Sequence, residues 1–392
     1  DLAIALAYLL ASDQIKEFET RDKMFVGELS LDGSLRGVNG GLNIAQLAKK
    51  LGFKYLFVPE ANAEEAAVVK EISVIPVSDL KALIAHLENQ TIIPAQPETA
   101  FVSDNQLSLV NFDDIKGQEN AKRALALAAA GGHNILMVGP PGTGKTMMAQ
   151  ALISLLPSLA LAEAIEVNQV YSAAGLLKKN NFISYRPLRS PHHSSSLISL
   201  IGGGSYPKPG EISLAHRGIL FLDEFPEFHR DLLEALRQPL ENGVINISRA
   251  KKTLTFPANF TLVAAMNPCP CGYFGDPQKE CRCAAYEVFR YQKKISGPLL
   301  DRIDIQIEVP RVEISELRNK KSTAKNTNQI LKSKIAAARK IQTQRFQNFK
   351  PKIHTNSEMT SKQVEAVINF DNSAENFLKN VLEKTFLSGR SY

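Results

Sequence analysis

One segment near the middle of the chain constrains the fold more than any other: HNILMV, then GPPGTGKT, then MMAQALISLL. The first part is an apolar run suited to a buried strand, and the last part favours a helix. The pattern G-x-x-x-x-G-K-[ST] between a strand and a helix is typical of a loop that binds nucleotide phosphates. Its glycines let backbone N–H groups surround the phosphates, and the helix N-terminus adds its positive dipole end. An accidental glycine-rich turn is disfavoured by these flanks. The predicted binding residues are Gly139, Pro140, Pro141, Gly142, Thr143, Gly144, Lys145 and Thr146.

A second segment, GILFLDEF at residues 218–225, is a hydrophobic strand that ends in two acids. With a phosphate loop upstream, we expect Asp223 and the Thr146 hydroxyl to hold Mg²⁺. Glu224 is then the candidate general base that activates the attacking water. Lys145 is expected to reach the β- and γ-phosphates of ATP. The alternative is that the two acids only cap the next helix.

A third strand, FTLVAAMN, ends at Asn267, whose amide can orient the same water or sense the γ-phosphate. From Asn111 onward helices and strands alternate, as in a parallel sheet with crossover helices. The predicted class is therefore an α/β core. We divide the chain into an α/β domain (1–88), a Pro-containing polar linker (89–109), the ATPase core (110–310) and a basic helical lid (311–392).

In the first domain the sequence predicts a hairpin in FVGELSLDGSLRGV, helices at Leu42–Leu51, near Asn62 and from Ser78, and strands at Tyr55–Val58 and Val74–Val77. A chain of 392 residues suits two or three domains. No apolar run reaches the roughly 18 residues that span a bilayer, so we expect no membrane segment. The chain starts without Met and ends inside a plausible helix, so a fragment is expected, incomplete in its first domain and in its lid.

The four cysteines lie within fifteen residues, as C-x-C, nine residues and C-x-C. Disulfide frameworks spread cysteines across small secreted chains, so a reducing cytoplasm fits this cluster better. Cys269, Cys271, Cys281 and Cys283 could close a tetrahedral structural Zn²⁺ site. Short C-x-C spacing is unusual for zinc, and free thiols or a redox pair stay open.

Charge is uneven along the chain. The net charge is +6, yet the stretch from Arg311 to Lys352 holds twelve Lys or Arg against Glu313 and Glu316. Such a block suits contact with a nucleic-acid backbone, and equally a solvated helical face.

Together these motifs resemble AAA+ ATPases. The preceding FDDIKGQENAKRAL is similar to the segment that covers the adenine in that superfamily, which implies contacts from Ile115 and Gln118. SGPLLDRIDI resembles the arginine-finger segment and makes Arg302 the candidate that reaches a neighbouring subunit's γ-phosphate. A local salt bridge of Arg302 with Asp301 or Asp304 is the alternative. FLSGRSY resembles the start of the sensor-2 helix and implies a role in cis for Arg390.

The long segment YRPLRSPHHSSSLISLIGGGSYPKPGEISLAHRGILFLDEF, with AAMNPCPCGYFGD, resembles the ComM/YifB family of magnesium-chelatase-like AAA+ proteins over essentially the whole chain. The resemblance implies a hairpin that projects toward a ring pore and carries Arg186, Arg189, His192 and His193. A stretch rich in Ser, Gly and basic groups suits a loop that grips a polymer backbone. A metal site at the two histidines is disfavoured, because adjacent histidines rarely share one ion.

The first domain resembles the Lon-protease (S5-type) fold. Lon's DGPSA corresponds to DLAIA here and its GGLK to GGLN, so Ile4 and Asn43 stand where the serine nucleophile and its lysine would be. Without a nucleophile or an activating amine, peptide hydrolysis has no mechanism. We therefore expect a degenerate protease fold used for assembly or substrate contact.

The family resemblance implies a cytoplasmic homo-hexamer that uses ATP and Mg²⁺ to unwind or branch-migrate single-stranded or branched DNA. It would support integration of imported DNA during natural transformation. The alternative is a magnesium-chelatase-type motor that remodels a protein partner for metal insertion. A non-catalytic scaffold is disfavoured by the presence of Lys145, Asp223 and Glu224.

Overall fold

The computed structural model describes residues 1–99, 101, 110–177, 182–204, 207–249, 252–312, 327–350, 353–368 and 370–384. The chain divides into two compact units. The first comprises Asp1–Asn105 with Leu159–Tyr185, and the second Gln106–Ser158 with Arg186–Tyr392. The sequence-based division placed residues 159–185 in the ATPase core, whereas here they group with the first unit.

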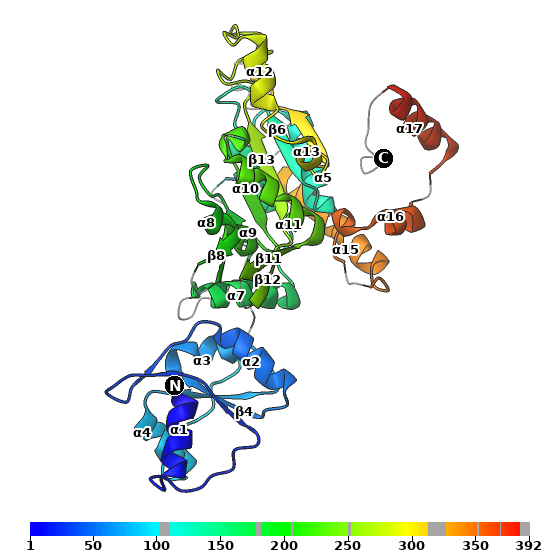
Figure 1. The fold of residues 1–392 in the computed structure, drawn as a ribbon. Coiled ribbons are helices and arrows are strands. Elements are labelled where there is room, and N and C mark those ends of the chain that lie inside the picture. Colours follow the sequence, from blue (N-terminus) through cyan, green and yellow to red (C-terminus); the bar gives the residue numbers. More distant parts are fainter. Residues whose placement is uncertain are drawn as a thin grey trace. The chain divides into compact units, whose positions relative to one another are not determined.

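The first unit is an α/β fold around a short parallel sheet of order β1-β4-β5, with an antiparallel β2–β3 hairpin. The hairpin and every predicted helix and strand form, within a few residues of the expected bounds. Strand β1 was not predicted. The elements are α1 (Leu2–Ala11), β1 (Lys23–Phe25), β2 (Glu28–Leu29), β3 (Leu35–Arg36), α2 (Gly41–Lys50), β4 (Tyr55–Pro59), α3 (Glu60–Ala66), β5 (Ser73–Val77), α4 (Leu80–Leu87) and α7 (Leu161–Ala174) (Figure 1).

Helix α7 belongs to this unit through specific polar contacts. The Asn43 side chain donates to the Gln169 carbonyl at 3.0 Å, and the Ser172 hydroxyl donates to Glu65 at 2.8 Å. Buried Asn168 donates to the Ile183 carbonyl and accepts from the Ile183 amide. At the position expected for a catalytic lysine, Asn43 thus binds a helix backbone. Ile4, at the expected nucleophile position, is 74% exposed on α1.

The second unit contains η1 (Phe112–Asp114), α5 (Glu119–Gly131), β6 (Ile135–Val138), α6 (Lys145–Leu155), β7 (Leu188–Arg189), α8 (Leu197–Ile201), β8 (Gly202–Gly203), β9 (Lys208–Pro209), α9 (Glu211–Leu214), β10 (Ile219–Leu222), η2 (Phe225–Glu227), α10 (Arg230–Ala235), α11 (Arg237–Asn242), β11 (Val244–Arg249), β12 (Lys252–Pro257), β13 (Thr261–Met266), α12 (Ala285–Gln292), α13 (Gly297–Leu300), β14 (Ile305–Glu308), α15 (Thr327–Arg345), η3 (Asn356–Glu358), α16 (Ser361–Val367) and α17 (Asn372–Lys384). Strands β11 and β12 form a separate antiparallel hairpin.

The core of the second unit is a five-stranded parallel sheet of order β14-β6-β13-β10-β7. The predicted α/β core with a parallel sheet is confirmed. Strand β6 comes first in the chain, and its two neighbours, β13 and β14, come last. Ligands of open parallel sheets bind at the carboxyl ends of the strands beside such a change of order. The phosphate loop follows β6 directly.

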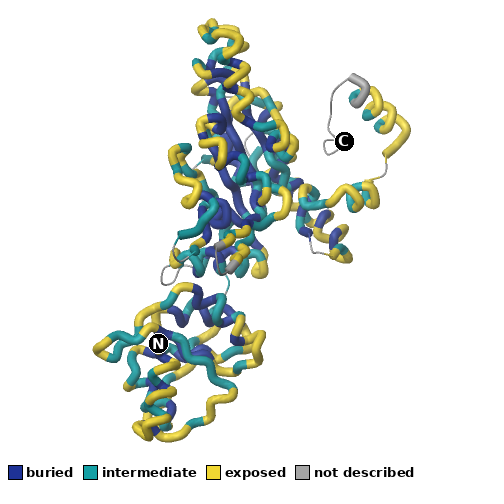
Figure 2. The backbone as a smooth tube through the Cα atoms, in the orientation of Figure 1, coloured by how far each residue is buried: buried dark blue, intermediate teal, exposed yellow. Residues whose placement is uncertain are grey.

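Alternate residues of the strands enter two apolar clusters, one on each face of the sheet. In β6, Ile135 and Met137 join the cluster formed with α5, α6 and α15, while Leu136 joins the cluster formed with α10, α12 and α13. Because both faces are covered, the three inner strands β6, β13 and β10 are mostly apolar, and Figure 2 shows the middle of the sheet buried. None of the helices in the described part of the chain is long and apolar enough to cross a membrane.

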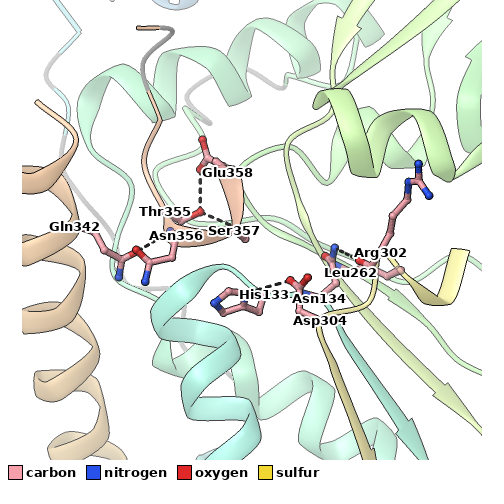
Figure 3. Close-up of polar contacts among 10 residues, drawn as sticks. All are labelled: His133, Asn134, Leu262, Arg302, Asp304, Gln342, Thr355, Asn356, Ser357 and Glu358. Carbon is pink, nitrogen blue, oxygen red and sulfur yellow. Dashed lines mark hydrogen bonds and ion pairs between the residues drawn. The ribbon is translucent and has the colours of Figure 1, made fainter. Parts of the chain in front are cut away.

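The amino ends of three strands are tied together by one side chain, Asn134 (Figure 3). Its Oδ1 accepts from the Leu262 amide of β13 at 2.8 Å, and its Nδ2 donates to the Arg302 carbonyl before β14 at 2.9 Å. Beside it, Asp304 Oδ2 lies 3.0 Å from His133 Nδ1. The backbone carbonyl of Asn134 accepts from Ile305 at 3.0 Å. Asn134 therefore fixes β6, β13 and β14 relative to one another.

Helix α15 covers the first apolar cluster through Ile335 and is held there by Gln342. The Gln342 amide donates to the Ala130 carbonyl at 2.9 Å. It also accepts from the Asn356 backbone at 2.9 Å (Figure 3). The helical character expected after residue 311 is thus present in the described part of that region.

Candidate nucleotide-hydrolysis site

The phosphate loop connects β6 to α6 in the predicted strand–loop–helix arrangement. Gly144 precedes the helix with φ of 84°, in the left-handed region that favours glycine. Gly139 donates its N–H to the Met266 carbonyl at 3.1 Å, and the Thr143 hydroxyl donates to the Pro140 carbonyl at 3.1 Å. The loop is therefore tied to the end of β13, where Asn267 follows.

Lys145 is the first residue of α6 and its ammonium lies inside the loop. It donates to the carbonyls of Gly139 at 2.6 Å and Pro140 at 2.9 Å, and to Asn267 Oδ1 at 3.3 Å. Burial lowers the pKa of Lys145, and the nearby charge of Asp223 opposes that shift. The lysine and the asparagine singled out from the sequence thus meet in the structure.

The proposed magnesium ligands also meet. The Thr146 hydroxyl donates to Asp223 Oδ2 at 2.7 Å, across a gap of 77 residues in sequence. A hydroxyl and a carboxylate side by side are hard oxygen donors of the kind that Mg²⁺ prefers. These two residues fit the cation that ATP hydrolysis requires.

Glu224 follows Asp223 with φ of 51°, an unusual left-handed conformation for a glutamate. Its N–H donates to Asp223 Oδ1 at 2.9 Å. Its carboxylate is 54% exposed and lies 3.1 Å from His193 Nδ1. No sequence pattern predicts this contact, because the two residues belong to separate motifs.

The prediction that Arg186 and Arg189 project from a hairpin is wrong. Arg189 lies in β7, within the central sheet, and its guanidinium forms a two-bond pair with Glu211 at 2.6 and 2.7 Å. Arg186 donates to the Pro157 and Arg217 carbonyls, both at 2.7 Å. Both arginines therefore support the fold. His192 and His193 follow in an exposed loop.

Arg302 is held by groups of its own chain. Its guanidinium donates to Glu241 Oε2 and to the Pro298 carbonyl, both at 2.6 Å, and its side chain is 13% exposed. The local pair foreseen as the alternative involved Asp301 or Asp304; the observed carboxylate is Glu241. Figure 3 shows the Arg302 side chain directed away from Asn134. An action on a neighbouring subunit would require Arg302 to leave Glu241.

The residues expected near the adenine occupy different environments. Ile115 is 1% exposed in the apolar cluster with Phe112 and Leu125. Gln118 has φ of 58°, and its amide donates to the Pro310 carbonyl. Contact of either residue with a base stays a prediction. Arg390 lies outside the described residues.

The four cysteines converge as predicted for a metal site, with all sulfurs within 4.8 Å of one another. Cys269 Sγ lies 3.4 Å from Cys271 Sγ and 3.7 Å from Cys281 Sγ. Disulfide sulfurs are about 2.05 Å apart, whereas four sulfurs around a zinc ion lie about 3.8 Å apart. A hydrogen bond from the Tyr273 backbone lowers the pKa of Cys271 to about 6, whereas burial and the neighbouring cysteines raise the pKa of Cys281 and of Cys283. The donor set therefore fits tetrahedral zinc.

The cysteine loop touches the phosphate loop. A Cβ at Gly272 would come within 2.7 Å of the Pro141 ring, so only glycine lets the two loops pack this closely. Asp276, in the same loop, pairs with Arg311 at 2.7 Å. The cysteine loop therefore packs directly beside the phosphate loop.

Several known proteins are similar in sequence to this chain. Residues 111–317 match the family described as magnesium chelatase, subunit ChlI; residues 1–62 and 325–392 match other models of the same subunit. The competence protein ComM of Haemophilus influenzae is 42% identical over the whole chain, which spans 76% of its length. The chain belongs to the ComM/YifB family of magnesium-chelatase-like AAA+ ATPases.

Two further proteins show how far the similarity extends along the chain. The uncharacterized protein YifB of Escherichia coli is 41% identical over 88% of the chain and 67% of its own length. The magnesium-chelatase 38 kDa subunit of Cereibacter sphaeroides is 28% identical over 40% of the chain. The match to ComM therefore covers the first unit and the cysteine segment together with the ATPase core.

Proposed function

We propose that this chain forms rings, most simply hexamers, that use ATP hydrolysis to translocate along DNA and drive branch migration. The process served would be the integration of imported DNA during natural transformation, in the cytoplasm. The observation that carries the proposal is that a set of candidate ATP-hydrolysis residues meets, Lys145 with Asn267 and Thr146 with Asp223, in a chain similar to a competence protein over its full length.

Each residue of the set has a definite task. Lys145 would exchange its loop carbonyls for the β- and γ-phosphate oxygens, while loop N–H groups hold the remaining charge. Thr146 and Asp223 would hold Mg²⁺, which neutralises developing phosphate charge when it is bound. Glu224 would take a proton from the attacking water, and the Asn267 amide would orient that water.

DNA contact is supported by the distribution of cations in the described part of α15 and the segment after it. Lys334, Lys340 and Lys350 are exposed there. Arg339 is different, because it donates to the Ala129 carbonyl at 2.7 Å and so fastens α15 to α5. The exposed lysines are suited to phosphate oxygens, since they need no base-specific geometry.

The decisive experiment compares the ATPase rate without DNA and with single-stranded, forked and four-way-junction DNA. The proposal expects stimulation, strongest with forked or junction DNA, and a decline of that stimulation as salt is raised. Lack of stimulation by all three would reject DNA as the substrate.

Ring formation gives Arg302 a role in trans. We expect Arg302→Ala to lose turnover in a homogeneous ring. Mixing it with a Lys145→Ala subunit, which keeps Arg302, should restore part of that turnover, because each subunit supplies what its neighbour lacks. If mixing restores no turnover, Arg302 does not act on the neighbouring subunit, and its role is limited to the ion pair with Glu241.

The second candidate is a magnesium-chelatase-type motor that remodels a protein partner. The family models favour it, because they are described by the chelatase subunit. The chelatase relative, however, covers only 40% of the chain. DNA-independent ATPase that rises with a protein partner would select this candidate.

We further propose that Cys269, Cys271, Cys281 and Cys283 hold a structural zinc ion. A bound ion with four sulfurs would have no open position for catalysis. Native mass spectrometry should find one zinc per chain. Paired Cys281→Ser and Cys283→Ser should lose it, whereas Ser190→Ala should keep it; a metal-free, fully folded parent protein would exclude zinc.

A further inference from the structure

We propose that the outer face of helix α12 binds single-stranded DNA, stacking bases on two aromatic rings and holding phosphates with two cations. We call its four residues, Tyr286, Phe289, Arg290 and Lys293, the aromatic–basic face. The inference rests on the proposed function and deepens it, because it names the surface and the form of DNA that this surface would recognise.

Helix α12 has two opposite faces that differ in burial. Val288 and Tyr291 are 6% and 5% exposed, and Tyr291 packs into the second apolar cluster. The residues of the aromatic–basic face recur at positions i, i+3, i+4 and i+7, so they share the opposite side of the helix. All four are exposed. Since an outer helical face is normally polar, two aromatic rings on it point to an interaction site.

The rings and cations of this face are arranged as in surfaces that bind single strands. Tyr286 is 68% exposed and Phe289 is 63% exposed. The Lys293 ammonium lies 5.2 Å from the centre of the Phe289 ring. Proteins that bind single strands without sequence preference combine rings that stack bases with cations that follow the backbone. The face offers both kinds of group on one side of one helix.

The charge around the face favours a polyanion over a second copy of this chain. Residues 279–294 hold five Lys or Arg and two acids. One of the acids, Glu287, caps the helix start, because its carboxylate accepts from the Ala284 N–H at 2.9 Å. A neighbouring subunit would have to place acids opposite Arg290 and Lys293, whereas DNA carries a phosphate at every nucleotide.

The face is carried on a firmly held helix. Gln292 Nε2 donates to the Pro268 carbonyl at 3.0 Å, and Lys294 Nζ lies 3.1 Å from Glu227 Oε2. Pro268 directly follows Asn267, the candidate that orients the attacking water. Figure 1 shows α12 at one end of the unit, beyond the strands, and Figure 2 shows that much of this end is exposed. The helix that bears the face is therefore attached next to the hydrolysis site.

Stacking would make the face selective for single strands. In a duplex the bases are paired and stacked on one another, so only phosphates can reach Arg290 and Lys293. In a single strand, Tyr286 and Phe289 can each take a base. The exposed lysines of α15 would contact the phosphates of either form. Loss of a ring should therefore weaken binding of single strands and leave binding of duplex DNA unchanged.

The test measures the Kd of the full chain by fluorescence anisotropy. The probes are a labelled oligothymidylate of about 20 nucleotides, longer than the site of one small binding domain, and a duplex of the same length. Phe289→Leu and Tyr286→Leu keep an apolar side chain but remove the flat ring. We expect each to raise the Kd for the oligothymidylate about fivefold to a hundredfold and to leave the Kd for the duplex unchanged. Phe289→Tyr keeps a ring and should bind like the parent protein.

The cations and a matched control give the test a second arm. Arg290→Gln combined with Lys293→Gln should weaken binding of both DNA forms. It should also lower the salt dependence for the oligothymidylate, by about 1.4 in the slope of log Kd against log salt, since each phosphate contact of a single strand contributes about 0.7. Tyr8→Leu is the control, because Tyr8 is 67% exposed on α1 of the first unit, and both Kd values should stay unchanged.

If the parent protein binds single strands and both leucine variants bind them equally well, the inference is overturned and the proposed function stands. Equal losses for single-stranded and duplex DNA also overturn it, because stacking cannot explain them. Mass photometry with ATP reports the assembly of each variant, and loss of assembly in Phe289→Leu would assign the face to a neighbouring subunit instead. If the parent protein binds neither form of DNA, the proposed DNA motor fails, and this surface fails with it.

Discussion

The two ends of the five-stranded sheet are held in opposite ways. At the carboxyl ends, side chains meet side chains: Thr146 meets Asp223, Lys145 meets Asn267 and His193 meets Glu224. At the amino ends, the Asn134 side chain bonds to the backbone of β13 and of the segment before β14, beside the His133–Asp304 pair (Figure 3). Contacts between side chains can be exchanged for a ligand by rotation, whereas bonds to the backbone fix the strands.

The difference follows from the geometry of a parallel sheet. Strands at their carboxyl ends lead into loops and helix N-termini, whose free N–H groups attract anions. The amino ends of these strands do not lead into helix N-termini, so no comparable group of free N–H donors lies there. The comparison therefore predicts that changes at the carboxyl end alter turnover, and that changes at the amino end alter stability.

The largest effect is expected for Glu224→Gln. Loss of a general base should lower kcat by about 10²–10⁴-fold, while bound ATP is retained because the phosphate loop is intact. Steady-state turnover and equilibrium ATP binding measure the two properties. Glu227→Gln is the matched control nearby, and normal turnover by Glu224→Gln would withdraw the base assignment.

Lys145→Ala should act on binding. Loss of charge-assisted bonds to phosphate oxygens should raise the Kd of ATP by about a hundredfold, and turnover at ordinary ATP concentrations should disappear. Titration with a fluorescent ATP analogue gives the Kd. ATP affinity equal to that of the parent protein would contradict the placement of Lys145 at the phosphates.

At the other end, Asn134→Ala leaves the Leu262 amide and the Arg302 carbonyl without their side-chain partner. We expect the free energy of unfolding of the ATPase unit to fall by about 2–4 kcal/mol. Urea denaturation measures this change, and kcat per folded chain should stay close to that of the parent. A loss of turnover without a loss of stability would break the comparison.

The smallest effect is expected for His133→Ala. The pair with Asp304 has side chains 31% and 35% exposed, so its removal should cost at most about 1 kcal/mol. The same denaturation experiment serves as the internal control for Asn134. If both variants lose the same free energy of unfolding, the stabilisation comes from the segment 133–134 as a whole, and the Asn134 amide has no special role.

Much of the fold and of the carboxyl-end site could be predicted from sequence because the relevant patterns are local. The strand before Gly139, the helix after it and the acids at 223–224 each occupy a short continuous segment. Their convergence follows from the topology of parallel strands, so Thr146 and Asp223 were expected together. The cysteine cluster could also be predicted from the sequence, because four thiols within fifteen residues can meet at one point.

Three features could not be predicted in this way. Residues 159–185 lie inside the ATPase core in sequence and group with the first unit, through contacts such as Asn43 to Gln169. Arg189 lies in a stretch whose composition suits a loop that binds a polymer backbone, yet its ion pair with Glu211 holds it at the central sheet. Strand β1 is too short, at three residues, to show a period.

The sequence by itself determined that the second unit binds nucleotide phosphates on a parallel sheet, because backbone conformation and apolar periodicity are encoded over a few neighbouring residues. The tertiary structure alone decided which side chains outside these motifs contact the candidate site residues. Glu224 meets His193 and Arg302 meets Glu241 across 31 and 61 residues. Such pairs depend on how separate segments pack, and a single sequence carries no periodic signal for them.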